Sequence, residues 1–489
     1  MTGSTDIRIS NKVLLKDCLL ISAMIGVCAI HQYAVIAVLV VLTVLALRST
    51  LFAVQALSIL FLLIYINPVI QLQSPQLLMF RWAVFFAACG RIFLSVLVRG
   101  GNVHEVQPIR YLHIFCSLAL ITNFIANPTS PVGYLKLFAF AFGVTAIFAG
   151  AAFNTVSRDR LFIWLLAMCV VIFGLSIPFL AIPAGYFSKM RQLEIAEAGD
   201  YVEVSAEWLG GFMGILGHAQ SFGTVAALLC TFLFVTIFFS KYQVRWIAVA
   251  TFMVGLVMLY LSKARTGGLA FMIAVTAVTL LAVFGGSARR RVHRTISHRA
   301  LPAIVLGGLV VLAGLLVGGG VITKGMRTFI EKGDESQQGI LDAYMGSRGG
   351  LIELSMANFR AHPIFGIGFG RNSWEAQGYA NPFADKGLLS LTFSPTEKGQ
   401  IATAVLEETG IIGALAFLTM IGSFILFFAR EANVYGLGLF VCVLALNMGE
   451  MNLFAMGGLG MLEWLFIAFG GMLADRCTDP VVQPGRPPR

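Results

Sequence analysis

The feature that most constrains this chain is a succession of apolar stretches along almost its whole length. Crossing a membrane as a helix takes roughly 17–25 predominantly apolar residues, and about fourteen stretches reach or approach that length. They lie near residues 14–30, 34–47, 51–66, 77–98, 112–126, 133–153, 161–183, 219–239, 246–262, 266–284, 301–322, 411–429, 434–449 and 457–474. Since several are short, we expect about 12–14 membrane spans.

Composition excludes a soluble protein. Hydrophobic residues make up 58% of the 489 residues, charged residues only 12%, and the mean hydropathy is +0.85. Ordinary soluble domains carry about 25% charged residues, because their surface must face water. We therefore predict an all-α fold, a polytopic transmembrane helical bundle with one large, partly helical periplasmic loop.

The spacing of the apolar stretches divides the chain into four parts. Residues 1–322 form the main bundle of about eleven helices and include an amphipathic outer loop at 184–218. Residues 323–410 form the large loop, and long ordered loops on a scaffold usually carry function. Residues 411–474 hold the C-terminal spans, and residues 475–489 are expected to be a disordered cytosolic tail.

Lysine and arginine are distributed unevenly between the two sides. With both termini in the cytosol, inner segments hold nineteen of them, and short outer loops hold five. Those five are Lys136, Lys189, Arg191, Lys263 and Arg265. Because cytoplasmic loops are enriched in basic residues, we expect cytosolic termini and an extracytoplasmic loop at 323–410. We therefore predict that the basic segment at 288–299 binds anionic lipid at the inner membrane surface rather than nucleic acid.

Several local motifs fall in the expected outer segments. They are GHAQSFG at 217–223, LSKARTGG at 261–268, GSRGG at 346–350, HPIFGIGFG at 362–370 and LEETGIIG at 406–413. In this order, around a long outer loop, they resemble the superfamily of O-antigen ligases and Wzy-type polysaccharide polymerases, over roughly residues 210–430. The N-terminal half is similar only in being helical and apolar.

The resemblance implies a membrane glycosyltransferase of the bacterial inner membrane that acts at the periplasmic face. Its donor would be a glycan on an undecaprenyl-pyrophosphate carrier, and its acceptor a glycan or a lipid. Polysaccharide-assembly proteins would be its partners, with no nucleic acid, no cofactor and no metal.

The sequence departs from the ligase pattern at one position. Ligases of this superfamily carry a His before Asn, Ser or Gln, followed by nine residues and Gly-x-x-Gly. Here Gly399-Gln400 precedes the nine residues, and the glycines are Gly410 and Gly413. The resemblance therefore favours a polymerase-like or divergent transferase over a ligase.

Breaking a sugar–pyrophosphate bond builds negative charge on the leaving phosphate, which fixed guanidinium groups stabilise. Arg265 and Arg348 are the candidates for this role. Snorkelling of Arg265 to lipid headgroups and simple solvation of Arg348 are the alternatives. Other polar residues of the outer segments are candidates for substrate binding: Lys263, Arg191, His218, Lys398 and Gln400.

The acceptor hydroxyl requires orientation and, in many transferases, a base. Glu397 and Glu408 are the candidates, on a helix expected to start after Ser394. Ser394-Pro395-Thr396-Glu397 also fits a capping box, which gives Glu397 a structural alternative. His218 and His362 are also expected to be structural, and the glycines at 366–370 to form a turn.

Two rival functions remain. A polysaccharide flippase or another secondary transporter also reaches 12–14 spans, but it would have short loops and buried charges near the midplane. Arg81, Arg91 and Glu463 lie within apolar stretches and are expected to face the bundle interior. A noncatalytic partner in an envelope polysaccharide complex is the second rival.

Overall fold

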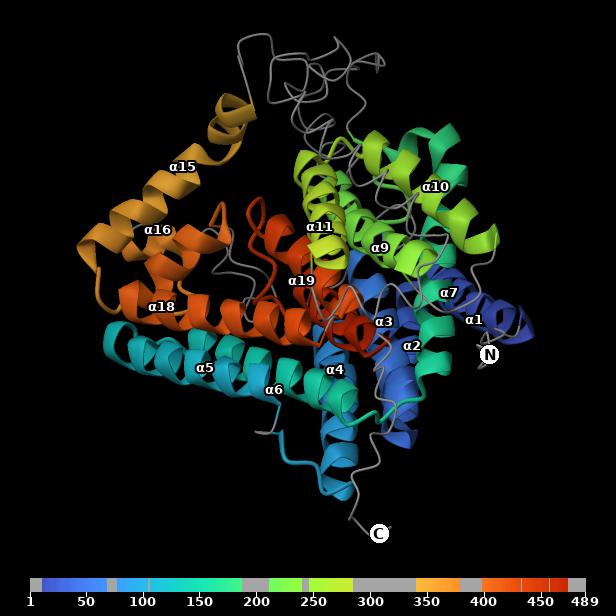
Figure 1. Ribbon diagram of the computed structural model, residues 1–489, viewed down its shortest axis with the longest axis horizontal. Coiled ribbons are helices and arrows are strands. Elements are labelled where there is room, and N and C mark those ends of the chain that lie inside the picture. Colours follow the sequence, from blue (N-terminus) through green and yellow to red (C-terminus); the bar gives the residue numbers. More distant parts are fainter. Residues whose placement is uncertain are drawn as a thin grey trace.

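The structure is a computed structural model of the chain. It describes residues 11–67, 77–103, 106–186, 211–239, 246–284, 340–378, 398–431, 433–456 and 458–473. Within these ranges every regular element is a helix, and the one strand-like pairing is an isolated bridge between Ile66 and Leu216. The all-α prediction is thus confirmed for the described part of the chain (Figure 1).

The first half of the chain supplies eight apolar helices to the bundle. They are α1 Asn11–Ile30, α2 Gln32–Arg48, α3 Thr50–Tyr65, α4 Leu77–Val98, α5 Gln107–Ala126, α6 Pro131–Ala152, α7 Arg158–Ser176 and α9 Ala219–Phe239. Between the last two lie the short 3-10 turns Pro178–Ala181 and Pro183–Gly185.

The second half supplies the remaining helices. They are α10 Trp246–Leu261, α11 Arg265–Phe284, α15 Ile340–Ala361, α16 Ser373–Ala376, α18 Ile401–Arg430, α19 Val434–Leu446, α20 Leu459–Leu465 and a π-helical turn, Phe466–Gly470. Helix α15 packs on the first part of α18, and α5 lies along α18 (Figure 1).

Local sequence explains where many of these helices begin. Ser49 separates α2 from α3, and its hydroxyl accepts a hydrogen bond from the amide of Phe52. Asn433 caps α19 by accepting from the amide of Gly436, while Pro131 starts α6 at the position where proline costs no hydrogen bond. The helices end where such capping residues interrupt the apolar sequence.

Eight of the described helices are long and apolar enough to cross a membrane, and five shorter helices are also apolar. The chain is therefore a multi-pass membrane protein. The expected span near 301–322 lies outside the described residues, as does the tail at 475–489. In the large loop, α15 and α16 confirm that the segment is partly helical.

The span predicted at 411–429 corresponds to the part of α18 that follows Gly410, where non-helical backbone angles break the helix, and a further helical segment, residues 401–409, precedes it. One sequence-based boundary is wrong. A helix running on from Ser394 to Glu408 is excluded, because Gly399 has φ +81° and Gln400 is extended at φ −152°. Lys136, expected in a short loop, lies inside α6 and is buried.

Candidate functional site

Helix α18 is kinked where the large loop returns to the bundle. Gly410 has φ +63° and ψ −166°, which only glycine adopts readily. A side chain there would collide with the carbonyl of Ile364, and one at Gly366 would collide with the backbone of residues 407–409. The amide of Ile367 donates to the carbonyl of Glu407 at 2.8 Å, and that of Gly368 to the carbonyl of Glu408 at 3.0 Å. The glycine-rich segment is a turn, as expected, that fastens the loop to the kink.

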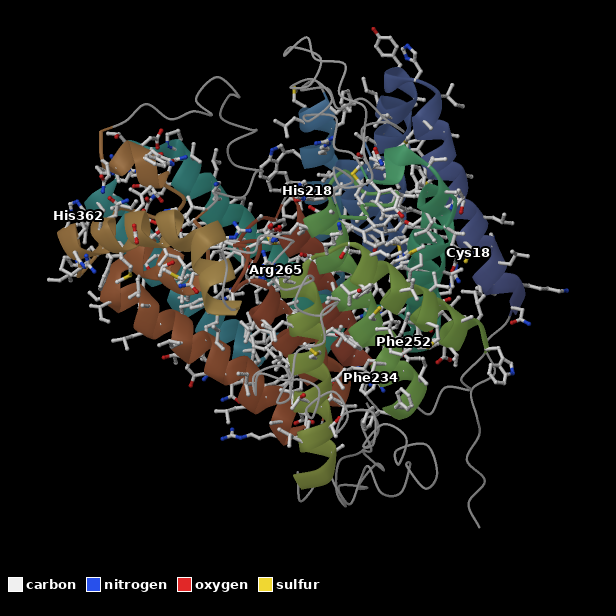
Figure 2. All side chains as sticks on the ribbon, turned by 90° about the horizontal axis from the view of Figure 1, so that it is seen from above. Cys18, His218, Phe234, Phe252, Arg265 and His362 are labelled. Carbon is white, nitrogen blue, oxygen red and sulfur yellow. The ribbon has the colours of Figure 1, made fainter. Side chains whose placement is uncertain are left out.

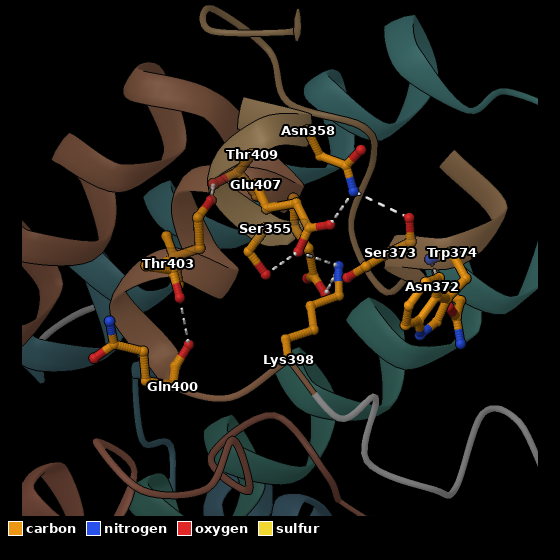
Figure 3. Close-up of polar contacts among 12 residues, drawn as sticks. Ser355, Asn358, Asn372, Ser373, Trp374, Lys398, Gln400, Thr403, Glu407 and Thr409 are labelled. Atoms are coloured by element: carbon orange, nitrogen blue, oxygen red, sulfur yellow. Dashed lines mark hydrogen bonds and ion pairs between the residues drawn. The ribbon is translucent and has the colours of Figure 1, made fainter. Parts of the chain in front are cut away.

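Beside the kink lies a sealed charge cluster, formed by Lys398, Glu407 and Glu408. Lys398 Nζ lies 3.2 Å from Glu407 Oε2 and 3.1 Å from Glu408 Oε1, and its side chain is 0% exposed. Ser355 Oγ and Asn358 Nδ2, both on α15, donate to the Glu407 carboxylate at 2.8 and 2.6 Å. Figure 3 shows Lys398 reaching into this group from the start of α18.

The two carboxylates decide the charge state of Lys398. Burial alone would lower the pKa of the Lys398 ammonium, but Glu407 and Glu408 outweigh it and raise the pKa above its usual range. Lys136 of α6, which interacts electrostatically with Glu408, adds a second positive charge nearby. Two cations thus face two anions, and the cluster compensates its own charge.

A second polar group, the open mouth, comprises Tyr344, Arg348, Gln400 and Glu450. Arg348 Nη2 lies 3.3 Å from Glu450 Oε1. Tyr344 Oη donates to the carbonyl of Met448 at 2.8 Å and lies 3.3 Å from Gln400 Oε1. The side chains of Arg348 and Glu450 are 12% and 25% exposed, so both charged groups remain in partial contact with the exterior.

The open mouth is organised by the turn at residues 447–450. Asn447 Oδ1 accepts from the amides of Asn452 and Leu453, and its Nδ2 donates to Glu463. The carbonyl of Asn447 accepts from the amide of Ile401, which fixes the start of α18 against this turn. The turn therefore holds Glu450 opposite Arg348.

The motif at 261–268 reaches the same turn. Gly449 is packed so closely on Thr266 that a side chain there would collide with it, and Gly223 is packed in the same way on Ala264. Arg265, the first residue of α11, lies between these two contacts in sequence and is half-buried. The motifs at 217–223 and 261–268 thus adjoin each other, and the second adjoins the open mouth.

The remaining residues singled out from the sequence belong to neither the sealed charge cluster nor the open mouth. Lys263 is exposed and has φ +53°, and the exposed His218 accepts from the amide of Gln220 through its own Nδ1. His362 lies at the edge of the molecule, well separated from Arg265 and His218 (Figure 2). Arg191 and Glu397 lie outside the described residues.

At the ligase histidine position, helix α15 takes the space of a side chain. A Cβ on Gly399 would lie 3.1 Å from Leu351 Cβ and 3.6 Å from the carbonyl oxygen of Arg348. The positive φ of Gly399 further disfavours any other residue there. The left-handed backbone, together with this tight contact, therefore favours glycine at position 399.

The sequence reasoning missed Glu450, Tyr344 and Asn447. A signal was present, because Asn447, Glu450 and Asn452 interrupt an otherwise apolar sequence within six residues. Polar residues inside an apolar C-terminal segment are costly unless they are paired or functional. They could have been recognised as part of a site.

Comparison with known proteins gives no match, either to a protein-family model or to a curated protein. The fold and the site define a multi-pass helical membrane protein with a sealed charge cluster and an open polar mouth at one end of α18. The assignment of function rests on the geometry of these groups and on the order of the motifs.

Proposed function

We propose that the protein is a membrane-embedded glycosyltransferase that acts at the periplasmic face of a bacterial inner membrane. It would polymerise or ligate glycans taken from an undecaprenyl-pyrophosphate-linked donor. The observation that carries this proposal is the meeting of distant motif segments. Residues 261–268 and 346–350 and the start of α18 each contact the turn at 447–450, and residues 217–223 pack on 261–268.

The mouth contains the groups that such a transfer requires. The acceptor hydroxyl oxygen attacks the anomeric carbon of the donor sugar, while the bond from that carbon to the pyrophosphate oxygen breaks. Arg348 and Arg265 stabilise the charge on the departing pyrophosphate. Gln400 and Tyr344, which border the mouth, orient the sugars through hydrogen bonds.

Glu450 is the best-placed carboxylate to accept the proton of the acceptor hydroxyl. Its side chain is 25% exposed, whereas that of Glu408 is 1% exposed and ion-paired with Lys398. When the donor pyrophosphate engages Arg348, Glu450 loses its ion-pair partner and becomes a stronger base. Substrate binding and base activation are then coupled, and Glu408 acts as a positioning residue.

The orientation of the chain belongs to the same proposal. The turns at the mouth connect helix ends that the lysine and arginine distribution assigns to the outer side. A topology reporter after residue 296 should read as cytosolic, and one inserted near residue 380 as periplasmic. Finding both reporters on one side of the membrane would contradict this orientation.

The function is tested with purified protein and defined lipid-linked glycans. Incubation of the protein with an undecaprenyl-pyrophosphate-linked repeat unit should lengthen the glycan or move it to an added acceptor, as seen by gel electrophoresis and mass spectrometry. Transport of the intact lipid-linked glycan across a proteoliposome membrane, with no new glycosidic bond, would instead support the flippase. Neither transfer nor transport would favour a noncatalytic partner.

A further inference from the structure

Near the start of α4 lies a guanidinium that has no ion-pair partner among the described residues. Arg81 makes no hydrogen bond or ion pair within the described residues, and its Nη2 atom is buried. The sequence explains this, because no Asp or Glu occurs between Asp17 and Glu105. Helices α2, α3 and α4 and their connections therefore offer no carboxylate to this cation. A largely desolvated guanidinium is costly unless an anion pairs with it, so Arg81 is suited to binding an anionic ligand.

Helix α4 packs against α3, and Tyr65, the last residue of α3, links Arg81 to Glu450 of the open mouth. Tyr65 interacts electrostatically with Arg81 and also with Glu450 and Glu463. Its hydroxyl accepts from the amide of Leu459 at 3.4 Å, and its carbonyl accepts from the amide of Gly217 at 2.7 Å. Tyr65 thus joins the start of α4, the segment after the 447–450 turn and the motif at 217–223.

We propose that Arg81 and the Tyr65 hydroxyl form an inner anion subsite that binds a phosphate group of the substrate. The identity of that substrate, a lipid-linked diphosphate, rests on the proposed function. In the mouth, Arg348 is already paired with Glu450, which compensates its charge. A diphosphate carries at least two negative charges, and a planar guanidinium binds phosphate oxygens in pairs. Arg81 adds to Arg348 and Arg265 a further positive charge, one that no described carboxylate pairs with.

The chain offers a matched control on the same helix. Arg91 also lies in α4 and has a buried Nε without a hydrogen-bond partner in the described residues. It is ten residues from Arg81, or about 15 Å along the axis at a rise of about 1.5 Å per residue. Arg81→Gln and Arg91→Gln remove the same charge from the same helix at different distances from the mouth.

The experiment measures binding and thermal unfolding of the full-length protein in phosphatidylcholine nanodiscs, with undecaprenyl pyrophosphate and with inorganic pyrophosphate as separate probes. At least one probe should raise the melting temperature of the wild type, because a ligand that binds only the folded state stabilises it. Arg81→Gln should weaken that binding about ten- to hundredfold, the usual range for a hydrogen bond to a charged group. Arg91→Gln should bind as the wild type does.

Without a probe, Arg81→Gln should melt no lower than the wild type, since it removes an unpaired charge. Weaker binding would then not reflect misfolding. Binding of only the lipid probe assigns the subsite to lipid-borne diphosphate, and equal binding of both assigns it to the diphosphate group itself. Wild-type affinity in Arg81→Gln, or no binding of either probe to the wild type, overturns the subsite.

The transferase and the subsite can fail separately. If Arg81→Gln loses binding but no preparation transfers glycan, the anion subsite stands and the transferase is excluded. If Arg81→Gln binds the probes and transfers glycan as the wild type does, the transferase stands and Arg81 has no role in it.

Discussion

The sealed cluster and the open mouth use the same kinds of side chain and differ in what surrounds them. In the sealed cluster, Lys398 is 0% exposed and contacts two carboxylates, and α15 also donates hydrogen bonds to one of them, that of Glu407. In the open mouth, Arg348 and Glu450 remain partly exposed. Charges that are buried and satisfied fix a backbone arrangement, whereas charges that are accessible can exchange a protein partner for a ligand.

The largest expected effect concerns the sealed cluster. Lys398→Met should leave Glu407 and Glu408 buried together without their shared cation, and breaking a buried ion pair costs about 3–5 kcal/mol. We expect a large drop in melting temperature in detergent and a low membrane abundance. Lys398→Arg, which keeps the charge, should be milder, and a normal melting temperature for Lys398→Met would show that the cluster is not a structural element.

A substitution in the open mouth should change the rate of glycan transfer rather than the stability of the protein. Glu450→Gln should lower glycan transfer by about 10²–10⁴-fold, the usual contribution of a general base, with the melting temperature nearly unchanged. Transfer at the wild-type rate would remove Glu450 as the base and leave positioning and leaving-group stabilisation as the sources of catalysis.

The next largest effect on glycan transfer is expected from Arg265 and Arg348, the two arginines of the motifs. Replacing Arg348 or Arg265 by Ala should reduce transfer by about 10²–10³-fold, as for other preorganised donors to a developing negative charge. Lysine should restore little activity, because an ammonium cannot reproduce the planar fork. Exposed Lys263→Ala is the matched control, and an equal loss there would indicate a general effect of outer positive charge.

A smaller effect is expected for Glu408→Gln. The amide keeps a hydrogen-bond acceptor for Lys398, and Glu407 still pairs with it, so the stability loss should be about 1 kcal/mol. Transfer should change little in the folded fraction. A loss of transfer comparable to that of Glu450→Gln, with normal stability, would move the base from the open mouth to the sealed cluster.

The smallest expected effect is the dependence of the melting temperature on pH. The raised pKa of Lys398 means that its contribution to stability is complete below the unfolded value of about 10.4 and is lost only as pH rises through the folded value. The melting temperature should therefore show no loss from this group between pH 6 and 9, and should fall only as pH rises above the unfolded value of about 10.4. Lys398→Met should lack the high-pH fall.

Helices were predictable from the sequence, and the sites were predictable only in part. The length of the apolar stretches predicted the bounds of α4 and α9 correctly, because lipid-facing and core-facing residues are both apolar in a membrane bundle. The break in the helix at Gly399 was missed, since the capping pattern at 394–397 favoured a continuous helix and a glycine also fits one, whereas Gly399 has φ +81°. Arg265 and Arg348 could be chosen from local motifs, whereas Glu450 could not, because its partner lies 102 residues away in the chain.

The kink at Gly410 also sets where α18 meets the bilayer. At a rise of about 1.5 Å per residue, its 30 residues measure about 45 Å, which is longer than a hydrocarbon core of about 30 Å. The 20 residues that follow Gly410 measure about 30 Å and match that thickness. With this match, the kink and the neighbouring open mouth would lie at the level of the lipid headgroups, where the proposed transferase would bring together a water-soluble acceptor and a lipid-anchored donor.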